Sequence, residues 1–596
     1  MAEETKKKQK RRRKKTQSEG EEKKDALKNF RVAFRSLEDP KKYLKNVLIP
    51  FIFLGVMFFC TPFILAIVLP VPVDIHPINF IAGGGICILM GILYPYITWK
   101  NKENDINSKM HFFITHLRVL AISDLPLKDI INVISKKKVY GGLGDELKKI
   151  NVLSTDWRTP LAKSFRFIAN RTPSKLFKDF LDRFSQSLVS GVEHREFIEQ
   201  EQGAVLQEYI TMYEASNENI TIINEVYVSL LISIIFIMAL GIVLPILLGG
   251  ENMNTFMYLS AFLLVFSEAA LLYLLKTMIP LDQIWRLSGE KGEMEKKMEK
   301  MFKTSVIACV AIGVGLGLCV YILRLPLVSS IPFELIVTFA ITPLIIPGIM
   351  AYKEEADIAR KERNFLAFLP SLGSISAMRG GKITESVYYL SEKDYGVLTK
   401  HLRDLYRRLR TRINDDSAWE WFGSETGSNY IQRASEMFRE ATYAAANPRN
   451  VSRMITENLR KIRDLRVKKL AIVKSSAALF AGITFGLAFC VYVSLVIGQH
   501  LNQILLEGMA SGNPFGGTNV GAAGPLLSAI PPEVFAISFM IGFLTLVMHS
   551  FMMGITIRLL RGSHFYTSFL YFVPFVWTVT VTALLVQTFL AGYLEV

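Results

Sequence analysis

Nine apolar stretches constrain the fold of this chain more than any other feature of its sequence. Each is long enough to cross the hydrocarbon core of a bilayer as a helix, which takes about 20 apolar residues. Inside lipid, only helices and closed barrels satisfy every backbone hydrogen bond. The sequence therefore predicts an all-α, polytopic membrane protein with about nine transmembrane helices. The stretches are 47–69, 77–98, 226–248, 255–275, 304–323, 331–351, 475–497, 533–556 and 568–590.

Two long hydrophilic blocks separate these stretches, and each has the size of a small domain. Apolar residues recur in them at a spacing of three to four, as from Leu176 to Leu188, and no alternating β-like run occurs. Thr172 with Pro173 predicts a helix start. We therefore expect two helical bundles. The predicted division is a basic, largely disordered tail (1–44), helices 1–2 (45–98), a first bundle (99–225), helices 3–6 with a loop at 276–303 (226–351), a second bundle (352–474), and helices 7–9 with a glycine-rich loop at 498–532 (475–596).

Positive charge predicts the orientation, because cytoplasmic segments carry an excess of Lys and Arg. With the N-terminal tail inside and nine alternating spans, only Arg324 among the 69 Lys and Arg residues lies outside the cytosolic segments. A shift by one span would move dozens of charges to the outside. We expect a multi-pass protein of the cytoplasmic membrane with a cytosolic N-terminus, an outer C-terminus and both bundles in the cytosol.

The two blocks are copies of one unit, about 255 residues apart. Tyr140-Gly141 and Tyr395-Gly396 occupy equivalent positions, and the stretch at 112–123 matches the one at 365–376. Such a period marks a repeated structural unit. Because each copy enters and leaves the cytosol in the same sense, the repeats are predicted to be parallel.

This twice-repeated helical block between membrane spans resembles the type II secretion system F domain. Two such domains on a nine-span anchor are similar to the platform proteins of the archaellum (the archaeal flagellum, FlaJ type) and of archaeal type IV pili. The resemblance covers about 45–590 and contains no catalytic signature. It implies a non-catalytic platform that couples a hexameric secretion ATPase to assembly, and to rotation in a rotating machine, of a filament of archaellin or pilin-like subunits. A second copy of the chain is a further expected partner.

Two groups of positive charge accompany the second bundle. Arg403, Arg407, Arg408, Arg410 and Arg412 form one helical cluster, which is either a solvated face or a docking face for an acidic patch of the ATPase. The other group runs into the seventh stretch and is interpreted as a solvated face with positive-inside anchoring, with a docking face for the ATPase as the alternative. Its members are Arg460, Lys461, Arg463, Arg466, Lys468 and Lys469.

The N-terminal tail carries nine positive charges between Lys6 and Lys15. Attraction to anionic lipid headgroups is the expected role. Nucleic-acid binding is not expected, because no aromatic residue interleaves these charges. On the outer side, the Gly512–Pro525 part of the glycine-rich loop is expected to be flexible and is a candidate contact for the filament base.

Three motifs resemble catalytic or ligand sites without meeting their requirements. Gly380-Gly381-Lys382 lacks the first glycine of a phosphate loop, and Ile383 replaces the Ser or Thr that holds magnesium. Gly142 to Asp145 spells the G-x-G-D of intramembrane aspartyl proteases, but that chemistry needs a second aspartate and no span contains one. The eight histidines show no metal-binding spacing, and the five cysteines all lie within spans. We predict no catalytic, cofactor or metal site.

Glu268 and His549 are ionisable residues inside the predicted spans. Aligning Phe262-Leu263 with Phe543-Leu544 places Glu268 on His549, at the same position in the two halves. Such residues are costly in lipid and suggest function. Two interpretations remain open: two independent polar residues that face a protein interior or reach toward the interface, and a hydrogen-bonded pair across the repeat axis.

Two other classes of protein remain as alternatives to a platform. Secondary transporters are also built from repeats with charged sites in the membrane, but their repeats are often inverted and need less cytosolic mass. An intramembrane aspartyl protease is disfavoured by the missing aspartate.

Overall fold

The computed structural model describes residues 43–44, 48–50, 52, 56, 77–123, 125–248, 253–279, 282–286, 292–322, 332–411, 414–510 and 530–594. Every regular element in these ranges is helical, which confirms the all-α class. Several predictions concern residues outside them: the basic tail, nearly all of the first span, Arg324, Arg412 and the Gly512–Pro525 segment.

Four long helices each extend from a bundle into the apolar part of the molecule. They are α4 (Pro77–Ala121), α9 (His194–Leu248), α13 (Ile345–Met378) and α18 (Pro448–Ala510). A 3-10 turn, Thr342–Leu344, joins α13 to α12 (Phe333–Ile341). The predicted boundaries at 98, 225, 351 and 474 all fall inside these helices. A helix satisfies its own backbone hydrogen bonds, so a change from apolar to polar side chains needs no break in the chain. The helix α18 also continues through the first part of the predicted outer loop, to Ala510.

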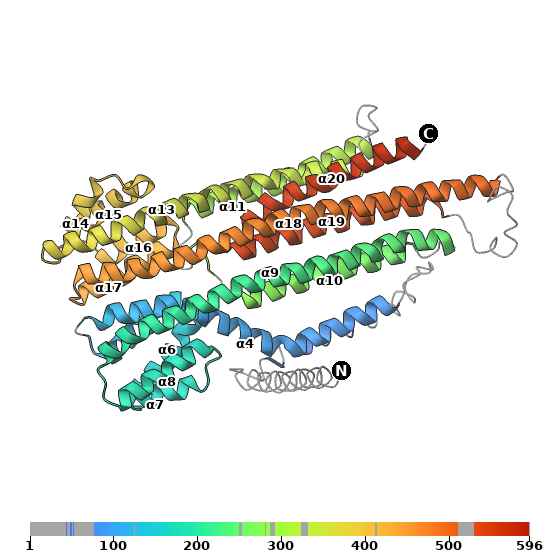
Figure 1. The fold of residues 1–596 in the computed structure, drawn as a ribbon. Coiled ribbons are helices and arrows are strands. Elements are labelled where there is room, and N and C mark those ends of the chain that lie inside the picture. The colour runs from blue at the N-terminus through green and yellow to red at the C-terminus, as the bar shows by residue number, and fades with distance from the viewer. Residues whose placement is uncertain are drawn as a thin grey trace, which may run out of the picture.

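Each bundle consists of four shorter helices packed beside the polar halves of two long ones (Figure 1). In the first bundle these are α5 (Leu127–Ser135), α6 (Gly141–Thr155), α7 (Leu161–Ala169) and α8 (Lys175–Val189). In the second they are α14 (Ile383–Ser391), α15 (Thr399–Thr411), α16 (Asp415–Thr426) and α17 (Asn429–Tyr443). The predicted start of α8 at Thr172 was early, since Ser174 caps this helix by accepting a hydrogen bond from the Phe177 amide.

The repeated Tyr-Gly pair has the same structural role in both bundles. Gly141 and Gly396 have positive φ values of 48° and 58°, which favour glycine. Gly141 directly follows a short 3-10 turn, Lys138–Tyr140, and Gly396 begins another, Gly396–Leu398. A Cβ on Gly396 would lie 2.8 Å from the Asn364 side chain of α13. The turn therefore needs a residue without a side chain at this point, which explains the recurring glycine.

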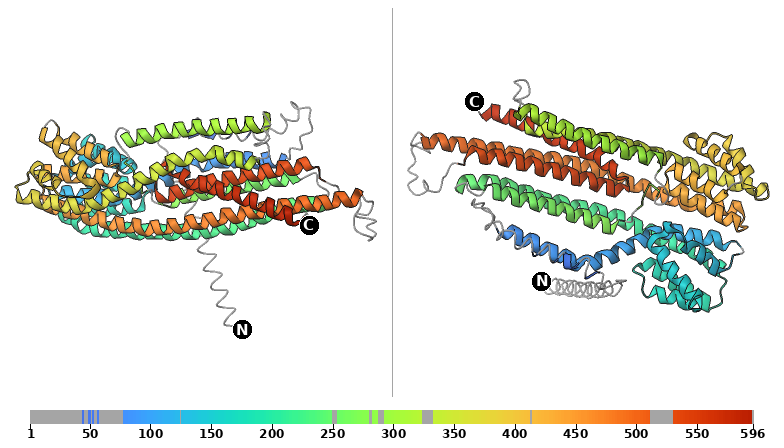
Figure 2. Two further views of the ribbon diagram at one scale, coloured as in Figure 1. Left: turned by 90° about the horizontal axis from the view of Figure 1, so that it is seen from above. Right: turned by 180° about the vertical axis from the view of Figure 1, so that it is seen from behind.

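The apolar ends of the long helices pack with α10 (Met253–Met278), α11 (Glu293–Gly317), α12 (Phe333–Ile341), α19 (Pro532–Arg561) and α20 (Ser568–Leu594). In the centre, α9 packs on α18 and α10 packs on α19, so equivalent helices of the two repeats meet in pairs. Both bundles lie at the same end of the molecule in every view, as the parallel repeat predicted (Figures 1 and 2).

Seven helices in the described ranges are long and apolar enough to cross a membrane. They overlap the predicted third to ninth spans. The predicted second span lies within α4, which is not among the seven, so the count of nine stays a prediction.

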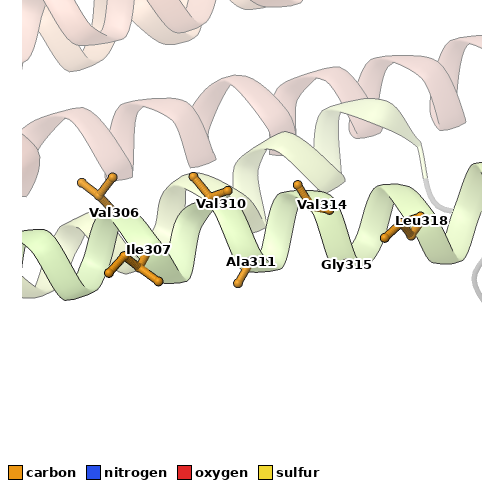
Figure 3. Close-up of a pocket in the computed structure, with 7 residues that line it drawn as sticks. All are labelled: Val306, Ile307, Val310, Ala311, Val314, Gly315 and Leu318. Carbon is orange, nitrogen blue, oxygen red and sulfur yellow. The ribbon is translucent and has the colours of Figure 1, made fainter.

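One side of α11 is apolar and carries a shallow hollow (Figure 3). Only aliphatic side chains and a glycine line it, so it suits the hydrocarbon tails of lipid. The lining residues are Val306, Ile307, Val310, Ala311, Val314, Gly315 and Leu318.

Candidate functional site

Glu268 of α10 and His549 of α19 meet in the interior of the apolar helix core. Both side chains are fully buried, and Nδ1 of His549 contacts Oε1 of Glu268. A further side chain from each half reaches this pair. The hydroxyl of Tyr227 on α9 donates to Oε1 of Glu268 at 3.2 Å, and Oγ1 of Thr484 on α18 lies 3.1 Å from Nε2 of His549. All four central helices therefore contribute to one polar cluster.

Hydrogen bonds link the four side chains of this cluster in a row, from Tyr227 through Glu268 and His549 to Thr484. The Thr484 hydroxyl donates to the Phe480 carbonyl at 2.8 Å, so its oxygen is free to accept from Nε2–H of His549. The second carboxylate oxygen of Glu268 is buried and has no hydrogen-bond partner among the described residues.

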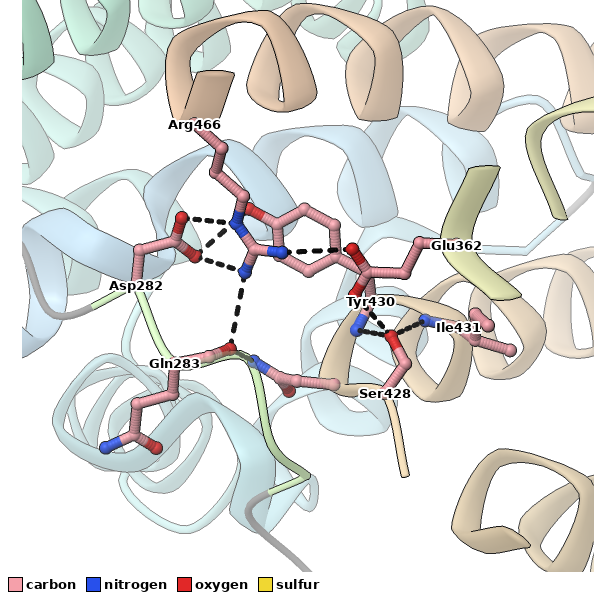
Figure 4. Close-up of polar contacts among 8 residues, drawn as sticks. Asp282, Gln283, Glu362, Ser428, Tyr430, Ile431 and Arg466 are labelled. Atoms are coloured by element: carbon pink, nitrogen blue, oxygen red, sulfur yellow. Dashed lines mark hydrogen bonds and ion pairs between the residues drawn. The ribbon is translucent and has the colours of Figure 1, made fainter. Parts of the chain in front are cut away.

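A second polar cluster joins the segment after α10 to the second bundle (Figure 4). Arg466 of α18 forms two hydrogen bonds with the Asp282 carboxylate, at 2.5 and 2.6 Å, and one with Glu362 of α13 at 3.2 Å. Its guanidinium group also stacks on the Tyr430 ring of α17, 3.5 Å from the ring centre. The Tyr430 hydroxyl donates to Asp282 at 3.1 Å. Arg466 of α18 thus contacts three other parts of the chain: the segment after α10, α13 and α17.

Electrostatics favour the charged form of Asp282. Burial alone would raise its pKa, but the charge and hydrogen bonds of Arg466 outweigh burial and lower this pKa to about 2. Asp282 is therefore an anion at any physiological pH. Because Arg466 is ion-paired and mostly buried, its interpretation as a solvated anchoring charge was wrong, and the same holds for the buried Lys469.

Backbone contacts strengthen the attachment of the 282–286 segment. The Asn429 amide donates to the Ile284 carbonyl, and the Arg286 amide donates to the Gly427 carbonyl, both at 3.2 Å. The indole of Trp285 donates to Oε1 of Glu355 on α13 at 3.2 Å. We call the residues Asp282–Arg286 the strap, because they run along the base of the second bundle.

Glu355 also holds the connection between α19 and α20. Its buried carboxylate accepts hydrogen bonds from the Ser563 hydroxyl at 2.9 Å, the His564 amide at 2.9 Å and the Thr567 hydroxyl at 2.8 Å. The connections that follow α10 and α19, the helices of the Glu268–His549 pair, are thus both attached to α13.

Helices of the first repeat form hydrogen bonds with the C-terminal end of α10. The side-chain amide of Asn104 on α4 donates to the carbonyls of Lys276, Thr277 and Ile279, at 3.0–3.2 Å. Ser216 of α9 donates to the Met278 carbonyl at 2.9 Å. These donors satisfy carbonyls that a helix end leaves free. The end of α10 therefore belongs to the first half, and the strap that follows it belongs to the second.

The two bundles contact each other through α4 and α17. Glu440 of α17 forms ion pairs with His116 of α4, at 3.0 Å, and with Lys137. Burial would raise the pKa of Glu440, but the hydrogen bond from His116 and the charges of His116 and Lys137 outweigh burial and lower it to about 2. Arg433 donates to the Val139 carbonyl at 3.4 Å and stacks on Phe112. The bundles are thus joined by charged contacts that are largely shielded from water.

The predicted arginine cluster lies on α15, but its members differ in their surroundings. Arg403, Arg407 and Arg410 are exposed, and Arg407 is 3.2 Å from Asp404 of the same helix. Arg408 is held by Glu425 at 2.5 Å and lies near the Trp421 ring. Arg412 lies outside the described residues.

The motifs that resemble catalytic sites lie in the bundles. Gly380 and Gly381 form a turn with positive φ between the helices α13 and α14, so no strand precedes Lys382 as a phosphate loop requires. Asp145 is exposed on α6, 3.3 Å from Lys148. No group of three metal-ligating side chains occurs in the ranges that the structure describes.

Comparisons with known proteins agree with this arrangement. A family model described as "Type II secretion system (T2SS), protein F" matches residues 113–242, which cover most of the first bundle and most of the membrane part of α9. The "Flagella accessory protein J" of Methanococcus voltae is 35% identical over 496 residues, 83% of this chain and 87% of that protein. The protein of the same name from Methanocaldococcus jannaschii is 31% identical over 567 residues, 94% of this chain and 96% of that protein. No solved structure matches.

Proposed function

The chain belongs to the family of the flagella accessory protein J, and we propose that this platform protein couples a hexameric secretion ATPase to the assembly of an archaellum or a related type IV pilus. The family match and the type II secretion F domain support the platform role. The partners and the coupling are our proposal. In this role the chain itself carries out no catalysis, and the energy comes from the ATPase.

The continuity of four helices between the bundles and the membrane region carries this proposal. Because α4, α9, α13 and α18 each belong to both regions, a protein bound to a bundle would act on the membrane helices without an intervening linker. A secondary transporter has no need for two such bundles. The orientation proposed from the charge distribution puts both bundles in the cytosol, where ATP is available.

The contacts of α10 and α19 support a path for this coupling. A displacement of the second bundle would move α13 and α17, which hold the strap and the 563–567 connection through Glu355, Tyr430 and Asn429. These connections lead to the helices that carry Glu268 and His549. We propose that the path ends at this pair, and that filament subunits are engaged by the membrane helices around it.

A binding experiment tests the proposal. The full chain, reconstituted in lipid nanodiscs, should retain a secretion ATPase from the same organism, and the yield should depend on whether ATP or ADP is bound. Empty nanodiscs and nanodiscs with an unrelated polytopic protein serve as controls. Absence of ATPase binding in every nucleotide state would contradict the proposal. In the cell, deletion of the gene should abolish filaments, and the wild-type copy should restore them.

A further inference from the structure

The face formed by α14 and α15 differs from the rest of the second bundle in its exposed side chains. Leu402, Leu405 and Leu409 are buried on one side of α15. On the opposite side, Arg403, Arg407 and Arg410 follow one another at helical spacing and are exposed. Packing in the bundle core explains the three leucines. It does not require arginine at all three exposed positions on the other side of the helix.

Aromatic side chains lie beside these arginines. Tyr388 and Tyr389 of α14 are 40% and 45% exposed, and the Tyr388 ring lies 4.9 Å from the Tyr406 ring of α15. The Arg379 guanidinium stacks on Tyr389 at 3.8 Å, and the neighbouring Met378 is 70% exposed. Tyrosine, arginine and methionine are the types enriched at protein–protein interfaces. We call this set, with Arg403, Arg407 and Arg410, the arginine–tyrosine face.

On the α14 side of this face, Glu385 lies 3.3 Å from both Arg379 and Lys382, so the unbalanced positive charge comes from α15. Among the described residues, no ion pair joins Arg403 or Arg410 to a carboxylate, and Arg407 has only Asp404 within 4 Å. Lys400, Arg403, Arg407, Arg408 and Arg410 against Asp404 give α15 a charge of 5 − 1 = +4. This positive charge attracts an acidic surface and raises the rate of its association.

The first bundle provides an internal comparison, because it has the same helices without this face. In α6, Asp145 and Glu146 balance Lys148 and Lys149, so the charge is 2 − 2 = 0. The positions 255 residues before Arg403, Arg407 and Arg410 hold Lys148, Val152 and Thr155, so only one of the three positive charges recurs, and Asn151 stands in place of Tyr406. A bundle of this type therefore folds without the arginine–tyrosine face, and its presence in one copy requires another explanation.

We propose that the arginine–tyrosine face is a docking surface for an acidic protein surface with an apolar pocket, and that only the second bundle binds this partner. The inference rests on the proposed function where it identifies the partner as the secretion ATPase. Lipid is a poor alternative, since α14 and α15 lie at the end of the molecule farthest from the membrane helices (Figure 1). Docking there would act directly on α13, which holds the strap.

Matched charge reversals in the two bundles test this asymmetry. One variant carries Arg403→Glu, Arg407→Glu and Arg410→Glu. The control carries three reversals at exposed lysines of the first bundle, Lys128→Glu, Lys136→Glu and Lys148→Glu. Affinity of the full chain in nanodiscs for the ATPase is measured from 50 to 300 mM salt, and circular dichroism checks that each variant is folded.

The second-bundle variant should weaken binding by about 10- to 100-fold at low salt and flatten its salt dependence, because the long-range attraction is lost. The control should change the affinity by less than about 2-fold. A third variant, Tyr389→Ala, should increase the dissociation rate while keeping the salt dependence of the wild type.

Other results would overturn the inference in distinguishable ways. Equal losses in both charge variants would indicate unselective attraction, and unchanged affinity in the second-bundle variant would place docking elsewhere. If the triple reversal abolished binding of single-stranded RNA but not of the ATPase, the face would be a nucleic-acid site. If the wild-type chain bound no ATPase at all, the proposed function would fail first.

Discussion

Nδ1 of His549 contacts Oε1 of Glu268 across 281 positions of sequence, in the interface between the equivalent helices α10 and α19. The contact joins the two repeats where neither water nor a lipid headgroup is available to either side chain. Removing one partner would leave the other buried with one hydrogen bond fewer, although Glu268 would keep its contact with Tyr227 and His549 its contact with Thr484.

This relationship predicts non-additive effects of substitution. Glu268→Gln and His549→Gln should each lower the free energy of unfolding by about 1–3 kcal/mol. The double variant should cost at least about 0.5 kcal/mol less than the sum of the two. Thermal unfolding in a mild detergent measures all four members of the cycle. Additive losses would show that the two residues act independently, and Ser267→Ala on α10 provides a control that leaves the pair intact.

The Asp282–Arg466 contact predicts a loss of stability in acid. The pKa of Asp282 is lowered from its ordinary value of 3.8 to about 2 in the folded protein. The ionised Asp282 therefore makes its full contribution to the free energy of unfolding above about pH 4, and this contribution is lost as the pH falls to about 2. A difference of this size corresponds to about 2 kcal/mol. Asp282→Asn should be less stable at neutral pH, and the difference from the wild type should shrink between pH 4 and pH 2. A constant difference over this range would contradict the assignment.

The ion pairs of Glu440 are expected to limit the motion of the two bundles relative to each other. Glu440→Gln removes the anion that His116 and Lys137 share, so the two bundles should separate more readily. Spin labels attached through Lys148→Cys and Lys382→Cys report the distance between the bundles, whose distribution should broaden. Glu199→Gln is the control, because its partner Arg118 lies in the same bundle as Glu199. An unchanged distribution in Glu440→Gln would mean that apolar contacts suffice.

The repeated glycine predicts a local effect of adding one methyl group. Gly396→Ala places a Cβ 2.8 Å from Nδ2 of Asn364, at a φ of 58°. It should destabilise the second bundle by about 1–2 kcal/mol, the cost of a left-handed conformation for an L-residue. Gly482→Ala in α18 has no atom within 4 Å of the new Cβ and should be neutral or stabilising. Proteolysis within the second bundle measures both, and equal rates would refute the steric explanation.

The helical class, the parallel bundles and the alignment of Glu268 with His549 followed from sequence, because apolar length, charge segregation and repeat spacing are properties of the chain itself. The strap had no such signal. Asp282 lies 184 positions from Arg466, and Arg466 occurs in a basic run of the kind that precedes many membrane spans. Thr484 gave no signal either, since a hydroxyl that donates to the carbonyl four residues earlier is common in any membrane helix. The arginines of α15 stood out in the sequence because so many occur in one short segment. Tyr388 and Tyr389 belong to α14, and only the fold brings them close to α15.

The length of α18 has a mechanical consequence. At about 1.5 Å per residue, its 63 residues form a rod of roughly 95 Å that passes from the second bundle through the helix core. A tilt of about 5° around one end would shift the other end sideways by roughly 8 Å, more than half the diameter of a helix. The rod is therefore a lever, and a small angular step at one end becomes a large lateral displacement at the other.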